Sequence, residues 1–164
     1  EKEDGRRLLA VLDSHYYTEA KGACGKRKCD HFDNDDCIKA RINAVRSLYD
    51  ADYKEKSWIV DTGAKFFPLL PKIKASIDKY YPGTKLAFTE YNFGGGTDIS
   101  GAVTQADFLG LLAKNEVYFA SIWAFDKAEY QFAAINMFTN YDEKGGYFAD
   151  SYIESTSSDD YRVS

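Results

Sequence analysis

The sequence predicts an α/β fold built on a parallel sheet, because short apolar runs alternate with helical patterns along the chain. The apolar runs cover 8–13, 85–90 and 117–123. They show little polar alternation, which is typical of parallel strands that are buried on both faces. Apolar residues recur at helical spacing over 37–48, 64–81, 103–114 and 127–139. The predicted architecture is therefore three parallel strands connected by helices.

The composition excludes several classes of protein. The chain has 164 residues, of which 45% are hydrophobic and 29% charged, so we expect one folded domain with a substantial core. The net charge of −5, with no basic block, argues against a nucleic-acid partner. No apolar run reaches the roughly 18 residues that a membrane-spanning helix needs, and no signal peptide is recognisable. The charged start, Glu1 to Asp4, is interpreted as a cut end.

The stretch from Lys85 to Gly96 is the most informative part of the chain. Its apolar run ends on Glu90, and a compact glycine-rich turn, residues 94–96, follows almost at once. Parallel α/β folds carry their working residues at the C-terminal ends of the strands. Tyr91 and Asn92 can hold or orient a polyhydroxy ligand there. The alternative is that Glu90 is a structural acid that caps the next helix or pairs with a lysine.

The other two predicted strands also end in polar or aromatic residues. His15 lies beside Asp13 and Tyr17, which favours a role in a site as much as a structural role. Trp123 ends the last run, where an indole either packs in the core or offers a flat surface to a sugar ring.

The loop 18–36 and the residue that follows it contain all three cysteines. Cys24, Cys29 and Cys37 are accompanied by His31, but this spacing is a weak match to a zinc site. One disulfide with a free thiol, a metal site and three free thiols all stay open. The acidic run 33–36 suggests calcium, yet it lacks the glycine and terminal glutamate of an EF-hand loop.

Two further observations concern the whole fold. The chain has no dinucleotide-binding fingerprint after a strand, and it is too short for a complete (β/α)8 barrel, which needs about 250 residues. After a turn at 140–146, the polar segment 147–163 alternates weakly and predicts one or two exposed antiparallel strands.

Sequence blocks spread along the chain carry a resemblance to a known family. They are 12–20 (LDSHYYTEA), 46–50, 57–59, 89–95 (TEYNFGG), 98–101, 105–107, Trp123 and 140–142. Through these blocks the chain resembles glycoside hydrolase family 44, a family of retaining endo-β-1,4-glucanases that also act on xyloglucan. The block Thr-Glu-Tyr-Asn at 89–92 is the most specific of them.

The resemblance implies a fold and a set of site residues. The family fold is a TIM-like (β/α)8 barrel with an attached β-sandwich, so residues 1–140 would supply barrel strands six to eight. Residues 141–164 would begin the sandwich. Glu90 matches the catalytic nucleophile. The implied substrate-binding residues are His15, Tyr17, Tyr91, Asn92 and Trp123.

The resemblance also implies what the chain lacks and where it acts. The family's acid/base glutamate belongs to a strand that is missing here, and Glu19 is a weak substitute. We therefore expect a secreted β-glucan hydrolase fragment, without metal or cofactor, that needs the N-terminal half of the barrel. The alternatives are a non-catalytic glucan-binding or scaffold fragment and another retaining glycanase, such as a mannanase or xylanase.

This interpretation makes a geometric prediction. The C-terminal ends of adjacent parallel strands lie at one edge of the sheet, about 4.8 Å apart. We expect His15 and Tyr17 on one side of Glu90 and Trp123 on the other, with Tyr17 reaching the Glu90 carboxylate. We also expect the loop 24–37 at this same edge.

Overall fold

The computed structural model describes residues 5–22, 29, 33–124, 127–148, 151, 153, 154, 156 and 158. In chain order the elements are β1 (Val11–Tyr17), α1 (Asp35–Ala44), a 3-10 turn (Val45–Leu48), α2 (Trp58–Gly63), a second 3-10 turn (Ala64–Phe66), α3 (Leu69–Tyr80), β2 (Lys85–Asn92), α4 (Ile99–Lys114), β3 (Phe119–Ile122) and α5 (Glu129–Thr139). No helix within these described ranges combines the length and hydrophobicity needed to cross a bilayer.

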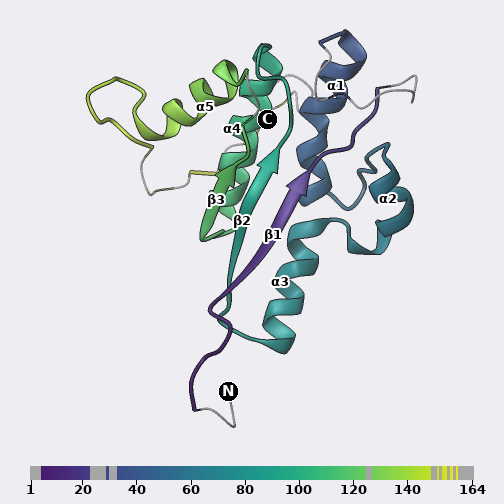
Figure 1. Ribbon diagram of the computed structural model, residues 1–164, viewed down its shortest axis with the longest axis vertical. Coiled ribbons are helices and arrows are strands. Elements are labelled where there is room, and N and C mark those ends of the chain that lie inside the picture. The colour runs from purple at the N-terminus through teal and green to yellow at the C-terminus, as the bar shows by residue number, and fades with distance from the viewer. Residues whose placement is uncertain are drawn as a thin grey trace.

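The three strands form one parallel sheet in the order β1-β2-β3, so β2 is central (Figure 1). This confirms the predicted α/β class and the adjacency of the three runs. The described residues form this three-stranded sheet, and its place in a barrel stays a prediction. The predicted antiparallel strands of 147–163 fall largely outside the described residues, and the described residues of that segment form no strand.

One face of the sheet carries the hydrophobic core. Leu86, Phe88, Tyr91 and Phe93 from β2 and the residue after it pack there, together with Tyr16 of β1. Helices α1, α3 and α4 cover this face, with the apolar residues Ala44, Leu70, Ile77, Phe108 and Leu112. The rings of Tyr91, Phe93 and Phe108 lie 4.4–6.5 Å apart. The helices and this face of the sheet therefore form the two layers of the domain (Figure 1).

The first strand differs from its prediction. It begins at Val11 rather than Leu8, because pairing with β2 starts at Val11 and Lys85, and Leu8 is exposed. It continues to Tyr17, with Asp13, His15 and Tyr17 on one face and Leu12 and Tyr16 on the other. The expectation of a strand buried on both faces is therefore wrong for β1, whose one face is polar and open.

Helix boundaries shift where a cap or a proline determines them. Asn34 caps α1, and its side chain accepts a hydrogen bond from the Cys37 amide, so the helix starts two residues earlier than predicted. Asp98 caps α4 in the same way through Ser100. The predicted helix 64–81 is interrupted before Leu69, because proline disfavours helical geometry in the residue that precedes it.

Smaller shifts affect the last two elements. β3 starts two residues later than predicted and ends one residue earlier, at Ile122. α5 starts at Glu129 rather than Lys127. Trp58 begins the short helix α2 and is exposed.

Candidate functional site

A β-bulge in β2 determines where Glu90 points. Ser14 pairs with Phe88, but His15 pairs with Glu90, so Thr89 is an extra residue in β2. The pairing with β3 shows the same shift between Phe88 and Tyr91. Without the bulge, the two-residue period would place Glu90 on the core face with Phe88. The bulge turns Glu90 onto the polar face, and bulges are common beside active sites for this reason.

Two residues of β1 contact the Glu90 carboxylate. The Tyr17 hydroxyl donates a hydrogen bond to Oε2 at 2.9 Å, and His15 Nδ1 lies 3.3 Å from the same oxygen. Glu90 retains 31% of its side-chain exposure, so a ligand can reach it. The predicted flank of His15 and Tyr17 is thus confirmed, including the contact from Tyr17.

The Tyr17 hydroxyl is a stable donor in this position. Burial, followed by the hydrogen bond to Glu90, raises its pKa from 10.0 to about 12. Both causes favour the protonated phenol, since an ionised phenolate would face a carboxylate. Tyr17 therefore keeps its proton and continues to donate to Glu90 across the physiological range of pH.

Asp13 and Thr89 extend the polar network along the sheet. The Thr89 amide donates to Asp13 Oδ1 at 3.0 Å, and the Thr89 hydroxyl donates to Oδ2 at 2.6 Å. The side-chain hydrogen bond from Thr89 lowers the pKa of the Asp13 carboxyl. Thr89 Oγ1 also lies 3.3 Å from His15 Nε2. Thr89 was missed from the sequence, because its partner Asp13 lies on the neighbouring strand, far away in the chain.

Trp123 follows β3 on the opposite flank of Glu90. Its amide donates to the Tyr91 carbonyl at 3.0 Å, so its backbone continues the pairing with β2. Its side chain is 55% exposed. The predicted placement of Trp123 at the same edge of the sheet is confirmed.

Asn92 and Tyr91 were expected to contact a ligand, and the structure places both of them in buried positions. Asn92 is buried, and its amide donates to the Trp123 carbonyl and accepts from Gly94 and Gln131. Tyr91 is 2% exposed, and its hydroxyl accepts a hydrogen bond from Gln105. The bulge turns Tyr91 into the core and the amide of Asn92 is bonded within the protein, and a substrate-binding role for either residue stays a prediction.

A buried arginine joins the loops at this edge. Arg41 of α1 contacts the Cys29 carbonyl, Asp33 and the Ser100 hydroxyl, and it lies 3.7 Å from Asp98. These residues belong to the loop after β1, to α1 and to the start of α4. The described part of the loop 24–37 is therefore held to the cap of α4, in agreement with its predicted place at this edge.

The glycine-rich turn is tightly enclosed. A Cβ at Gly95 would lie 2.6 Å from the Arg41 guanidinium, and the Gly95 backbone is in the left-handed region. A Cβ at Gly96 would collide with the Lys127 carbonyl, and one at Gly101 with the Gly95 carbonyl. These glycines permit the close approach of the turn, α4 and α5, which confirms the interpretation of residues 94–96 as a turn.

The structure decides part of the cysteine question. Cys29 and Cys37 form a disulfide, so the alternative with one disulfide is confirmed for this pair and a Cys3His zinc site is excluded. Cys24 and His31 lie outside the described residues. Asn34 caps α1 and Asp33 pairs with Arg41, which accounts for two members of the acidic run without calcium.

A buried carboxylate supports the chain where it leaves β1. Glu55 accepts hydrogen bonds from the Thr18 hydroxyl at 2.9 Å and from the Glu19 amide at 3.2 Å, with the Ser47 hydroxyl at 3.4 Å. Burial raises the pKa of Glu55 in spite of these donors. Since Thr18 follows Tyr17 directly, this contact fixes the end of the strand that presents Tyr17 to Glu90.

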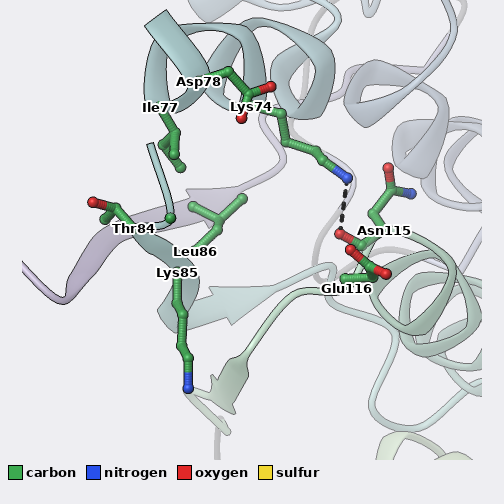
Figure 2. Close-up of a pocket in the computed structure, with 9 residues that line it drawn as sticks. Lys74, Ile77, Asp78, Thr84, Lys85, Leu86, Asn115 and Glu116 are labelled. Atoms are coloured by element: carbon green, nitrogen blue, oxygen red, sulfur yellow. Dashed lines mark hydrogen bonds between the residues drawn. The ribbon is translucent and has the colours of Figure 1, made fainter. Parts of the chain in front are cut away.

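A shallow pocket lies at the other end of β2. It is lined by Lys74 and Ile77 of α3, by Lys85 and Leu86 at the start of β2, and by Asn115 (Figure 2). Lys74 Nζ donates to the Asn115 carbonyl at 3.2 Å across it. Because it opens at the N-terminal end of the strand, it is remote from Glu90.

The fold and this network define a parallel α/β protein with a carboxylate at the C-terminal edge of its central strand, between a histidine–tyrosine pair and an exposed tryptophan. No protein-family model matches the chain. It is 42% identical over 158 residues to endoglucanase A of Paenibacillus lautus, and the match covers 96% of this chain and 23% of that protein. It is 41% identical over 168 residues to beta-mannanase/endoglucanase A of Caldicellulosiruptor saccharolyticus, covering 94% and 12%.

Solved structures give the same result. A xyloglucanase of Paenibacillus polymyxa from glycoside hydrolase family 44 matches with a TM-score of 0.85 and 46% identity, over 91% of this chain and 29% of that one. A Paenibacillus polymyxa xyloglucanase of the family solved with xyloglucan matches with a TM-score of 0.84. These matches confirm the resemblance to family 44. The chain spans less than a third of the length of each of these relatives.

Proposed function

We propose that this chain carries the nucleophile and one wall of the active site of a retaining β-1,4-glucan hydrolase. The observation that supports this most directly is the Glu90 carboxylate, partly exposed at the C-terminal edge of β2 and bound by Tyr17 and His15. In retaining hydrolysis such a carboxylate attacks the anomeric carbon and forms a glycosyl-enzyme, which water then releases.

The contacts of Tyr17 and His15 with Glu90 suit an attacking carboxylate. Both Tyr17 and His15 approach the same oxygen, Oε2. Two contacts on one oxygen fix the rotation of the carboxylate, and the attacking oxygen would then be Oε1. Holding a reacting group in one orientation before the reaction reduces the entropy that must be lost in the transition state.

We propose that the proton donor comes from outside the described residues. A retaining mechanism requires a second carboxyl group roughly 5–5.5 Å from the nucleophile, protonated when the bond breaks. Asp13 shares His15 with Glu90, but its lowered pKa keeps it ionised, and both of its oxygens accept from Thr89. Asp13 is therefore unsuited to be the acid, and the missing acid/base glutamate of the family stays the best assignment.

The substrate class follows from the exposed aromatic surface and the relatives. Trp123 follows β3 at the same edge of the sheet as Glu90, and its exposed indole can offer a flat apolar face on which the C–H groups of a sugar ring pack. The relatives are named as endoglucanases and xyloglucanases, and one also as a mannanase. We therefore place β-1,4-glucans first, with mannan as the second candidate. A secreted location fits both a polymeric substrate and the Cys29–Cys37 disulfide.

The nucleophile can be tested without the proton donor. An activated 2-deoxy-2-fluoro cellobioside with a dinitrophenolate leaving group departs without protonation, and its fluorine slows release of the glycosyl-enzyme. We expect mass spectrometry to find one added fluorocellobiosyl group, on Glu90. Glu90→Gln should abolish this labelling, while Glu129→Gln at the start of α5 should leave it unchanged. In contrast, the chain should release no reducing ends from carboxymethyl cellulose.

Other outcomes of the labelling experiment would distinguish the alternative functions. Binding of cello-oligosaccharides without any labelling would favour a non-catalytic glucan-binding fragment. Faster labelling by the manno- or xylo-configured reagent would change the substrate class and leave the role of Glu90 intact. Labelling at a carboxylate other than Glu90 would overturn the assignment of the nucleophile.

A further inference from the structure

A buried pair of amide side chains holds the segment that carries Trp123. Asn92, the last residue of β2, and Gln131 of α5 are 3% and 2% exposed. Asn92 Nδ2 donates to the Trp123 carbonyl at 2.6 Å, and Asn92 Oδ1 accepts from the Gly94 amide at 2.6 Å. Gln131 Nε2 donates to Asn92 Oδ1 and to the Gly94 carbonyl, both at 3.0 Å. The two side chains therefore connect α5, the glycine-rich turn and the residue that follows β3.

The orientation of both amide groups follows from the backbone groups that they meet. A backbone amide can only donate, and a carbonyl can only accept. Asn92 must therefore turn its oxygen to the Gly94 amide and its nitrogen to the Trp123 carbonyl. Gln131 must turn its nitrogen to the Gly94 carbonyl, and that nitrogen has a second hydrogen for Asn92 Oδ1. Turning either amide over would bring acceptor against acceptor, so this arrangement satisfies groups that the reversed one does not.

The backbone of Trp123 is bound on both sides. Its amide donates to the Tyr91 carbonyl at 3.0 Å, which continues the pairing with β2, while its carbonyl accepts from the side chain of Asn92. The indole is more than half exposed, so the place of this backbone, more than the packing of the ring, determines where the indole lies. The hydrogen bond from Asn92 is therefore the second anchor of Trp123, beyond the end of β3.

We propose that Asn92 and Gln131 are positioning residues that act through Trp123. Asn92 holds the Trp123 carbonyl, and Gln131 holds the amide of Asn92 in the orientation that this contact requires. Because Asn92 lies in the same strand as Glu90, the contact fixes the exposed indole to the strand that carries the proposed nucleophile. The consequence for glucan binding rests on the proposed function, whereas the anchoring of Trp123 does not.

The order parameter of the Trp123 backbone amide, measured by ¹⁵N NMR relaxation, reports this anchoring. Asn92→Asp keeps the size of the side chain and the oxygen that accepts two hydrogen bonds, but it replaces the donor to Trp123 with a second acceptor. At about pH 8 the new carboxyl is ionised, because two N–H groups donate to it. We expect the order parameter to fall from about 0.85, the value of rigid backbone, to about 0.6. Gln131→Met, which removes both donors without adding charge, should lower it by a smaller amount.

The matched control is Asn115→Asp, directly after α4. Asn115 Nδ2 also donates to a backbone carbonyl, that of Leu111 at 2.9 Å, and the residue lines the pocket at the other end of β2. This variant should leave the order parameter of Trp123 unchanged. The proposal would be overturned by an equal fall in Asn115→Asp. It would also be overturned by an unchanged value in Asn92→Asp or, should that variant not fold, in Gln131→Met.

Glucan binding gives a second readout, in which a role through Trp123 differs from a general structural role. Calorimetric titration with cellohexaose would compare the native chain, Asn92→Asp, Trp123→Ala and the double variant. Asn92→Asp should weaken binding roughly 2- to 10-fold, the size of one aromatic contact. It should cause no further loss once Trp123 is alanine, because the two residues then share a single effect. A full additional loss in the double variant would overturn the proposal.

The two readouts also separate this proposal from the proposed function. If the native chain binds no cellohexaose, the proposed function fails, and the order parameters still decide whether Asn92 anchors Trp123. If cellohexaose binds but the order parameter of Trp123 does not respond to Asn92→Asp, only the positioning proposal fails.

Discussion

The two faces of β2 have opposite characters, although one strand supplies both. On the covered face, Leu86, Phe88 and Tyr91 are buried and contact the helices through an aromatic cluster. On the polar face, Thr89 is exposed and Glu90 partly exposed, and their partners are hydrogen-bonding groups of β1. One extra residue in the strand separates these two environments.

This difference teaches that stability and chemistry are divided between neighbouring positions. The covered face gains free energy from apolar burial, which is large and non-directional. The polar face consists of hydrogen bonds between partly exposed groups, each contributing little net stability, so its value is orientation. Substitutions on the two faces should therefore affect different measurements.

The largest effect is expected from adjacent residues on the two faces. Phe88 is completely buried, with its ring packed edge-on against Phe108. Phe88→Ala should lower the free energy of unfolding by about 3–5 kcal/mol, because it removes apolar contacts and leaves a cavity. Thr89→Ala should lower it by about 1 kcal/mol or less. Urea unfolding followed by circular dichroism would measure both variants.

The contrast between the two faces would be contradicted if Thr89→Ala lowered the free energy of unfolding as much as, or more than, Phe88→Ala. A loss for Thr89→Ala as large as that for Phe88→Ala would show that the polar network is a main source of stability. The division between the two faces would then have no energetic basis.

The covered face could be predicted from the sequence, and the polar face only in part. Apolar runs and helical periodicity are local signals, and they identified the three strands, their parallel order and most of the helices. The bulge at Thr89 leaves no such signal, because it depends on pairing with β1 and β3 together. Tyr91 was misplaced for this reason, since a regular strand places it on the same face as Thr89.

Long-range polar contacts could not be predicted from the sequence either. Arg41 has the helical surroundings of an ordinary surface arginine, yet it is buried among the loops that follow β1 and β2. Glu55 lies between the predicted helices 37–48 and 64–81, and it is buried beneath the end of β1. The family resemblance could point to Glu90, His15 and Tyr17 as candidate site residues, because their motifs are local. The contacts of Arg41 and Glu55 join residues far apart in the chain, so no local motif indicates them.

Two glycines in α4 test how tightly the covered layer packs along that helix, with effects on stability of intermediate size. Gly101 lies at the end of the helix that packs against the glycine-rich turn, where an added Cβ would collide with the Gly95 carbonyl. Gly110 lies in the same helix with nothing within 4 Å of such a Cβ. Gly101→Ala should destabilise the chain by roughly 1–3 kcal/mol or more through overpacking. Gly110→Ala should stabilise it by about 0.5–1 kcal/mol through helix propensity.

Because the two substitutions are chemically identical, each controls for the other. Thermal unfolding should give melting temperatures on opposite sides of the native value. Two shifts of the same sign would contradict the view that the covered layer is tight at the site edge and open further along α4.

The smallest effect on stability, and the most specific to the polar face, concerns the Tyr17 hydroxyl. Its pKa of about 12 has two kinds of cause, with burial first and then the hydrogen bond and charge of Glu90. Glu90→Gln removes the negative charge and leaves the burial. The Tyr17 pKa should therefore fall toward 10.0 without reaching it. This fall can be followed up to about pH 11 by ¹³C NMR of the ring carbon that is bonded to oxygen. The Tyr17→Phe variant identifies the signal.

The sign of the linked stability follows from the same shift. Because the pKa of Tyr17 in the folded chain exceeds 10.0, its ordinary value, the contact stabilises the fold at lower pH. That contribution declines as the pH rises from 10 through about 12. If Glu90→Gln left the Tyr17 pKa unchanged, burial alone would explain the shift, and the phenol would not report the charge of Glu90. A fall all the way to 10.0 would show the reverse, that the carboxylate accounts for the whole shift and the polar face is more open to water than its packing indicates.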